Sequence, residues 1–291
     1  HPDPRRLPAA GAMKLRHALV CALLLGCLST PEAQAPEPGR VARWDAPLVH
    51  NDWLSEFTPK DKGRFGLDNV SLESESGAFE DFLRVQYWKG SASPSASRRA
   101  GVKEGGAQWL GQLPSGPADH AFLRYFVRFA TDFEFVKGGK LPGFYGGTQV
   151  SGGNIPDGTN GFSTRFMWRT GGQGEVYVYM PSSTRFGTSL GRGSFVFQPG
   201  KWHCIEQELA LNTPGQLDGQ VRVWLDGAPV FEQGALLFRT VPELRIEGLF
   251  FSTFFGGGDP SWAPPRDTHA DFAAFAISGD RIGCDTQGGA S

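Results

Sequence analysis

The 291-residue sequence lacks a long hydrophobic run, an internal repeat and a long helical pattern. Its main apolar stretch, residues 18–28, is shorter than the roughly 20 residues that a membrane-spanning helix needs. We therefore expect no membrane span and a fold that depends on neither long helices nor repeated units.

An excess of one charge is also missing. The chain has 28 Lys and Arg residues against 30 Asp and Glu residues, a formal net charge of −2 at pH 7. A nucleic-acid-binding protein carries a basic excess, so we expect no nucleic-acid partner. A local basic groove for an acidic ligand remains compatible with this balance.

Cysteine is scarce, and only Cys204 and Cys284 lie outside the N-terminal apolar stretch. In an oxidising compartment they would form a disulfide that closes a loop of about 80 residues and adds about 4 kcal/mol of stability on the loop-entropy account. The alternative is two separate buried thiols. Neither their spacing nor the histidines indicate a zinc site.

The N-terminal part has the pattern of an export signal. Basic residues precede the apolar stretch, as in a signal peptide that begins at Met13. Cleavage before Cys27 would leave a lipid-anchored cysteine, whereas cleavage after Ala35 would release the protein, and both remain open. We expect residues 1–35 to be upstream residues and signal peptide, 36–43 a linker and 44–285 a single domain.

Two catalytic patterns are absent. The GxxxxGK[ST] run of a phosphate-binding loop does not occur, which excludes that class of nucleotide site. The E-x-D-x-x-E strand pattern of retaining glycanases, which supplies two carboxylates about 5 Å apart, is missing as well. Nucleotide and glycanase chemistry are therefore disfavoured.

Glycine, proline and aromatic residues are abundant, with 40 Gly, 21 Pro and 12% aromatics, a composition that suits short strands and tight turns. Alternating apolar and polar positions predict strands at residues 65–72, 82–88, 120–129, 201–211, 220–232, 249–255 and 271–278. We predict an all-β fold, an antiparallel two-sheet β-sandwich of jelly-roll type.

Residues 162–180 read as a hairpin with a Gly-rich turn at 170–174. Because successive strand side chains point to opposite sides, Phe162, Phe166 and Trp168 share an apolar face. The other face carries Ser163, Arg165, Met167, Arg169, Glu175, Tyr177 and Tyr179. Pairing Arg169 with Glu175 would place Arg165 opposite Tyr179, whereas a slip of two residues would place it opposite Tyr177.

Other segments are less regular. Residues 90–106 and the Gly-rich run 137–147 are expected to be loops, the first solvated or bordering a substrate. The loop residues Trp262 and Arg266 are candidates for a cleft border.

The remaining singled-out residues are expected to have structural roles. Core positions are expected for Trp202, Trp224, Phe250, Phe251, Phe254 and Phe255. Asp259, Asp267 and Asp271 are expected to cap turns rather than to bind Ca²⁺.

Five blocks in order resemble polysaccharide lyase family 14, the jelly-roll alginate and glucuronan lyases. They cover residues 139–147, 162–169, 174–179, 202–206 and 250–257. The resemblance implies a catalytic set of Lys140, Ser163, Arg165, Tyr177 and Tyr179, and substrate-binding roles for Arg169, Tyr145, Gln149 and Glu175. The cysteines that the family often carries near residues 151–153 and 161–162 are missing here, and no histidine lies between Lys140 and Tyr179.

The resemblance implies an exported lyase that cleaves a 4-linked uronate polysaccharide by β-elimination. Lys140 and Arg165 would neutralise the carboxylate, and a tyrosine, its phenolate favoured by the adjacent cations, would serve as base and acid. This scheme needs no cofactor and no metal. We expect an acidic polysaccharide as partner, a monomer, and a secreted or periplasmic location or an outer-membrane lipoprotein.

Two other functions compete with this interpretation. The many aromatics and the hairpin at 221–230 would suit a non-catalytic carbohydrate-binding β-sandwich. A glycoside hydrolase on the same kind of sandwich is less favoured, because Glu175 has no partner carboxylate in the pattern.

Overall fold

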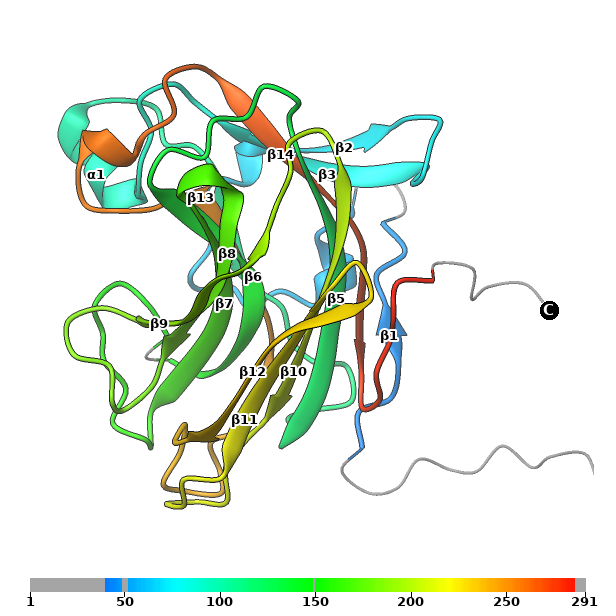
Figure 1. The fold of residues 1–291 in the computed structure, drawn as a ribbon, viewed down its shortest axis with the longest axis vertical. Helices are drawn as coiled ribbons and strands as arrows, with labels where there is room; N and C mark the ends of the chain where they lie inside the picture. Colours follow the sequence, from blue (N-terminus) through cyan, green and yellow to red (C-terminus); the bar gives the residue numbers. More distant parts are fainter. Residues whose placement is uncertain (1–39, 49–51, 149, 286–291) are drawn as a thin grey trace, which may run out of the picture. The chain divides into compact units, whose positions relative to one another are not determined.

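The computed structural model describes residues 40–48, 52–148 and 150–285 (Figure 1). The predicted signal peptide with Cys27, residues 36–39 of the predicted linker and Gln149 lie outside these residues. None of the helices described is long and apolar enough to cross a membrane.

Two antiparallel sheets make up the described part of the chain, which confirms the predicted β-sandwich (Figure 1). The eight-stranded sheet has the order β12 (Ala228–Leu236), β11 (Gly219–Leu225), β10 (Trp202–Ala210), β5 (His120–Phe129), β14 (Thr268–Ser278), β3 (Asp81–Tyr87) and β2 (Val70–Ser74), with β1 (Trp44–Asp45) also paired to β14. The six-stranded sheet has the order β4 (Ala107–Leu110), β13 (Gly248–Phe255), β6 (Gly138–Gly147), β7 (Gly161–Arg169), β8 (Gln173–Tyr179) and β9 (Thr188–Val196).

Short helices occupy the connections. They are the α-helix α1 (Pro94–Ala100) and the 3₁₀ turns η1 (Ser55–Phe57), η2 (Leu67–Asn69), η3 (Thr170–Gly172) and η4 (Pro260–Trp262). Residues 67–69, predicted as part of a strand, form η2, so that β2 begins later than expected.

An aromatic core fills the space between the sheets. Phe166 and Trp168 of β7 are fully buried, and the Trp168 ring lies 5.5 Å from Phe129 of β5 in the facing sheet. Each buried aromatic side chain removes about 150–250 Å² from water, at about 25 cal/mol per Å². The apolar side of β7 therefore anchors the strand, and its other side is held rigidly.

The predicted hairpin is present as β7 and β8, joined through η3. Its register is the alternative with the two-residue slip, because Arg165 lies opposite Tyr177 and Ser163 opposite Tyr179. The Gly-rich turn is shorter than expected, since β8 already begins at Gln173.

The expectation of a loop at residues 137–147 is wrong from residue 138 onward, because residues 138–147 form β6, which pairs with both β13 and β7. Its glycines permit close approach: a Cβ at Gly139 would lie 2.0 Å from the Trp168 ring, and one at Gly143 would lie 2.2 Å from the Thr164 carbonyl. Pro142 falls at a register shift, a place where a strand tolerates proline.

The expectation of a loop throughout residues 90–106 is also wrong, because the segment contains α1. Ser93 caps the helix by accepting the Ala96 N–H at 3.4 Å, Pro94 starts it, and Gly101 ends it with a φ of 67°. These are ordinary helix start and stop signals.

A disulfide joins Cys204 of β10 to Cys284, with the Cα atoms 5.8 Å apart. It ties the end of the described chain to the eight-stranded sheet. Nearby, Glu206 accepts the backbone N–H groups of Ile282 and Gly283 at 2.6 and 3.0 Å. The predicted pairing is confirmed, and disulfides of this kind are typical of proteins from oxidising compartments.

Candidate active site

A cleft of about 560 Å³ lies on the six-stranded sheet, on the face turned away from the core. Its floor comes from β6, β7, β8 and β13, because alternate residues of these strands point away from the facing sheet. The floor residues are Lys140, Arg165, Met167, Arg169, Tyr177, Tyr179 and Phe254. The cleft is also lined by Phe65, Ser93, Pro94, Ser95, Arg98, Gln108, Ser151, Gly152, Phe186, Gly257, Gly258 and Trp262.

Arg165 of β7 lines the floor of the cleft and is only 2% exposed. Its Nη1 donates to Ser252 Oγ at 3.0 Å, its Cζ lies 4.5 Å from the Phe250 ring centre, and its Nε has no partner among the described residues. Burial lowers the pKa of Arg165 to about 10, against the opposing effect of the two tyrosines. The guanidinium is therefore a fixed, poorly neutralised cation.

Lys140 of β6 is half-buried beside the β7–β8 hairpin. Its Nζ lies 2.9 Å from Met167 Sδ and 3.9 Å from the Tyr177 ring centre. Burial, with Arg165 and Arg169 nearby, lowers the pKa of Lys140 well below its ordinary value, while Glu175 opposes this shift. The environment thus favours the neutral amine.

Tyr177 and Tyr179 lie side by side on β8, with ring centres 5.9 Å apart in an edge-to-face arrangement. Burial, reinforced by Tyr179, raises the pKa of Tyr177 to about 12, which contradicts the expectation that adjacent cations favour its phenolate. The hydroxyl of Tyr179 accepts the Gly153 N–H at 3.2 Å. Desolvation outweighs the neighbouring arginines at Tyr177.

Arg169 reaches the cleft from the end of β7 and is held by Glu175. Its Nη2 donates to Glu175 Oε1 at 2.6 Å, and Arg192 Nε donates to Oε2 at 2.7 Å. The Glu175 carboxylate is fully buried and does not line the cleft. Its visible task is to hold two arginines.

Besides Glu175, two further predicted site residues in the described part of the chain, Ser163 and Tyr145, do not line the cleft. Ser163 is fully buried and donates to the Val150 carbonyl at 2.6 Å, so it fixes the adjoining loop. Tyr145 is fully buried and packs edge-to-face against Phe250 at 6.3 Å. Gln149 falls outside the described residues.

The structure adds cleft residues that the sequence did not single out. Phe254 lines the cleft, so the expectation that it belongs to the core is wrong. Phe250 is buried as expected, in a small cluster with Tyr145 and Val150, and it lies under Arg165. Their neighbours Phe251 and Phe255 are in the core as expected, which follows from strand alternation. Of the two suggested border residues, Trp262 lines the cleft, whereas Arg266 pairs with Asp132 and Glu134 elsewhere.

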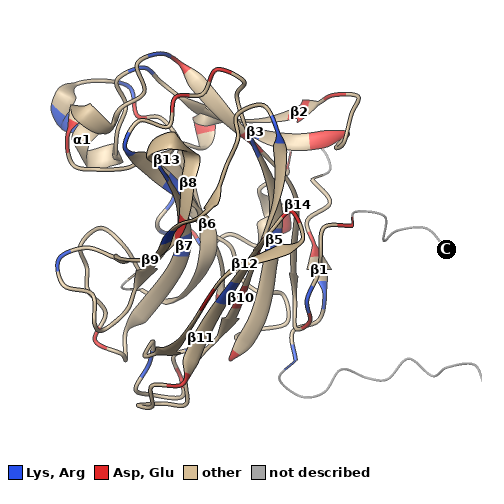
Figure 2. Ribbon diagram, viewed as in Figure 1, with Lys and Arg blue, Asp and Glu red and all other residues tan. Residues whose placement is uncertain are grey.

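The charge of the cleft is one-sided. Four of its lining residues, Arg98, Lys140, Arg165 and Arg169, are basic, and none of the described lining residues is Asp or Glu. In Figure 2 blue segments mark basic residues on α1 and on the strands around β7. The rest of the molecule balances this charge, since the net charge of the chain is −2.

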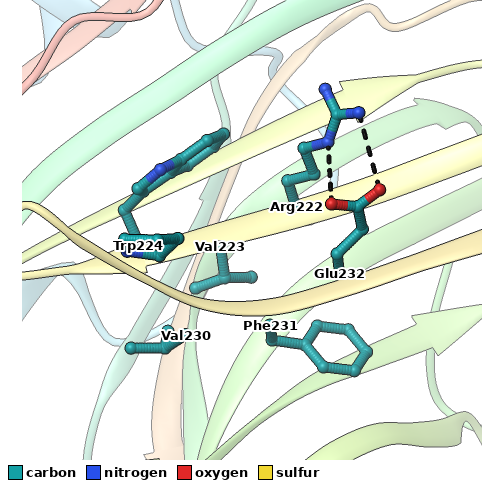
Figure 3. A pocket seen from close by; sticks show the side chains of 7 residues that line it. Arg222, Val223, Trp224, Val230, Phe231 and Glu232 are labelled. Atoms are coloured by element: carbon teal, nitrogen blue, oxygen red, sulfur yellow. Dashed lines mark hydrogen bonds and ion pairs between the residues drawn. The ribbon is translucent and has the colours of Figure 1, made fainter.

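A second hollow of about 480 Å³ lies at the β11–β12 hairpin (Figure 3). Arg222 and Glu232 form an ion pair at 3.3 Å there, with Trp224, Val230 and Phe231 beside them. Its charges neutralise each other, and it contains none of the residues predicted for the site. The cleft on the six-stranded sheet is therefore the candidate site.

Metal ligation has no support in the described residues, which contain no group of three or more His, Cys, Asp or Glu side chains placed to hold an ion. Asp259 caps η4, and Asp267 accepts the Lys89 N–H at 2.8 Å. Asp271 pairs with Arg84 and Arg128. These three aspartates therefore serve as a helix cap, a turn acceptor and an ion-pair partner.

The sequence profile of the family described as Polysaccharide lyase 14 matches residues 75–275. The chain has no match among curated protein sequences.

Solved structures of alginate and glucuronan lyases are similar to this chain. The crystal structure of the marine PL-14 alginate lyase from Aplysia kurodai is 32% identical, with a TM-score of 0.70, over 82% of this chain and 98% of that one. An alginate lyase from Chlorella virus shares the fold at 23% identity and a TM-score of 0.64, over 74% of this chain and 90% of that one. A glucuronan lyase from Trichoderma reesei shares it at 12% identity and a TM-score of 0.55, over 84% of this chain and all of that one.

The profile match over most of the sandwich, together with the Aplysia relationship, assigns the chain to polysaccharide lyase family 14 and makes it a polysaccharide lyase.

Proposed function

We propose that this lyase acts on a 4-linked uronate polysaccharide, alginate or glucuronan, by β-elimination in the cleft described above. The observation that carries this proposal is the cleft lining, which has four basic side chains and no carboxylate among the described residues. Arg98, Arg165 and Arg169 keep such a surface positively charged when Lys140 is neutral, so it attracts a polyanion. It also lacks the carboxylate pair of a retaining glycosidase, which would lie about 5 Å apart.

Arg165 is proposed to bind the carboxylate of the sugar that loses its proton. Removing the C5 proton places negative charge on that carboxylate as an enolate-like species. A buried, preorganised guanidinium stabilises such charge more strongly than water does. The fixed position of Arg165 on Ser252 and Phe250 supports this role.

Lys140 is proposed as the base that takes the C5 proton. The sequence alone suggested a neutralising cation, but the lowered pKa of Lys140 favours the neutral amine, which has a free electron pair. The amine lies beside Tyr177 and Met167, at the same floor as Arg165. Arg165 can then stabilise the charge on the carboxylate while Lys140 takes the C5 proton.

Tyr179 is proposed as the acid. As the C5–H electrons form the C4=C5 bond, the C4–O4 bond breaks, and O4 takes the Tyr179 proton. The Gly153 N–H that reaches its hydroxyl would stabilise the oxygen anion left behind. Tyr177, which stays protonated because its pKa is raised to about 12, would donate a hydrogen bond to the substrate.

The remaining predicted residues are proposed to support this set. Arg169 would bind a neighbouring carboxylate, with Glu175 fixing its guanidinium. Ser163 would position the loop that carries Gly153, and Tyr145 would support Phe250 beneath Arg165. Gln149 remains a proposed substrate contact.

The cellular setting is also a proposal. Export is supported by the basic and apolar N-terminal pattern and by the disulfide. We propose a secreted or periplasmic monomer with one lyase domain over residues 44–285, and lipid anchoring if cleavage occurs before Cys27.

A substrate panel tests the proposal. The exported protein is incubated with polymannuronate, polyguluronate, glucuronan and a neutral glucan. Formation of unsaturated product from at least one polyuronate, and none from the neutral glucan, is expected. Activity on the neutral glucan alone would contradict the proposal.

A further inference from the structure

One side of the cleft carries groups that the proposed chemistry does not use. We call it the α1–η4 wall and define it as residues 93–98 and 257–262. Its two halves contact each other through α1 and η4. Arg99, the next residue of α1, also donates from Nη2 to the Gly258 carbonyl at 2.7 Å. In Figure 1 α1 lies beside the orange segment that holds η4.

Trp262 is held in one orientation within this wall. A Cβ at Gly257 would lie 2.2 Å from the indole, so the ring packs directly against bare backbone. Asp259 caps η4, which fixes the turn that carries the ring. Arg169 Cζ lies 6.0 Å from the ring centre. Trp262 therefore presents a fixed, half-buried apolar surface next to a cation.

Arg98 is the charged group of the wall. Its side chain is 63% exposed, and Nη1 donates to Glu104 Oε1 at 2.7 Å. Glu104 does not line the cleft, and Nε and Nη2 of Arg98 have no hydrogen-bond partner among the described residues. The guanidinium is thus oriented while keeping donors for a further carboxylate.

We propose that the α1–η4 wall is an accessory subsite that binds one uronate unit away from the cleaved bond. This inference rests on the proposed function. A uronate ring has an apolar C–H face and one carboxylate, so it matches a flat indole next to a guanidinium. Trp262 stacks on the ring face, and Arg98 binds the carboxylate. Both are substrate-binding residues. They strengthen the binding of longer substrates and take no part in proton transfer.

The test measures kcat/KM on purified oligouronates from dimer to hexamer. The wild type gains about tenfold at the length that first reaches the wall, the gain expected for one charge-assisted contact with an aromatic surface. Arg98→Ala and Trp262→Ala remove that gain, mainly through KM, and leave shorter oligomers unaffected. Trp262→Phe retains most of it.

Lys103→Ala is the matched control. It also removes one positive charge near α1. The Lys103 Nζ, however, lies 3.6 Å from the centre of the Trp88 ring, and Lys103 does not line the cleft. This control is expected to keep the full gain. Equal losses by Arg98→Ala at every length, or no loss at any length, would overturn the subsite.

Failure of the proposed function would look different, because the wild type itself would form no unsaturated product. In that case, the affinity of each variant for hexauronate, measured by calorimetry, tests the subsite. Weaker binding by Arg98→Ala than by Lys103→Ala would support the subsite, and equal affinity would overturn it.

Discussion

Lys140 lies among two arginines and a glutamate, and its protonation state is the residue-level feature on which the proposed chemistry depends. Burial and the arginines hold the pKa of Lys140 low, and Glu175 raises it. The neutral amine of Lys140 is the active form. It takes up a proton and becomes inactive as the pH falls through the pKa that Lys140 has in the folded protein. We therefore expect kcat to decline on the acid side of the pH profile.

Glu175→Gln tests this electrostatic account. Removing the carboxylate removes the influence that raises the pKa of Lys140, so the acid limb of the kcat profile is expected to move to lower pH. Arg192→Ala is the control, because it removes a half-exposed partner of Glu175 and leaves the carboxylate in place. An acid limb that stays fixed or moves to higher pH in Glu175→Gln would contradict the role of Lys140 as base.

Strand alternation in the sequence predicted which face each site residue of the β7–β8 hairpin occupies, but it does not predict how deeply each side chain is buried. Ser163 and Arg165 share a face, yet the Ser163 hydroxyl is covered by the Val150 carbonyl of a loop. The burial of this hydroxyl by the loop becomes visible only in the folded structure. In the same way, the sequence suggested that cations favour the Tyr177 phenolate, whereas burial outweighs them.

Among the strands, β6 carries Lys140, and close packing sets its position. Gly139→Ala would place a methyl group 2.0 Å from the Trp168 ring, an overpacking that is expected to cost about 1–3 kcal/mol of unfolding free energy. Thermal or denaturant unfolding measures this loss.

Gly234→Ala is the matched substitution in β12. A Cβ there would meet nothing within 4 Å, and the residue needs no positive φ. Its stability is expected to remain within about 0.5 kcal/mol of the wild type. An equal loss in both variants would show that the packing against Trp168 is not what constrains β6.

Regular elements followed from the sequence where alternation was clear, as in β5, β10 and the β11–β12 hairpin. The β7–β8 register remained open between two pairings, because a shift of two residues preserves both faces. The strand β6 was missed since its glycines and Pro142 resemble a loop, and α1 was missed because seven residues are too few for a periodic pattern.

At the scale of the whole molecule, the disulfide links the last described residues to the eight-stranded sheet. Replacing Cys204 and Cys284 by serine is expected to remove about 4 kcal/mol, which corresponds to a Tm lower by about 10 °C. Activity well below the Tm is expected to stay unchanged, because the bridge is on β10 and the cleft is on the other sheet. A large loss of kcat at that temperature would contradict this separation of stability from function.

The composition and turn signals predicted the two-sheet sandwich, because many short alternating segments have few other ways to bury their apolar faces. The walls of the cleft were not predictable in the same way. They come from α1, η4 and loops far apart in the sequence, and their meeting depends on the completed sandwich.

We propose that the cleft performs elimination on a polyuronate, with Lys140 and Tyr179 moving the protons. The direct measurement is absorbance at about 235 nm during digestion of alginate or glucuronan, since elimination leaves a C4=C5 bond conjugated to the carboxylate. Wild-type protein is expected to produce this absorbance, and folded Lys140→Ala and Tyr179→Phe variants are each expected to lose about 10²-fold or more in rate. New reducing ends without the absorbance, or near-wild-type rates in both variants, would contradict the account.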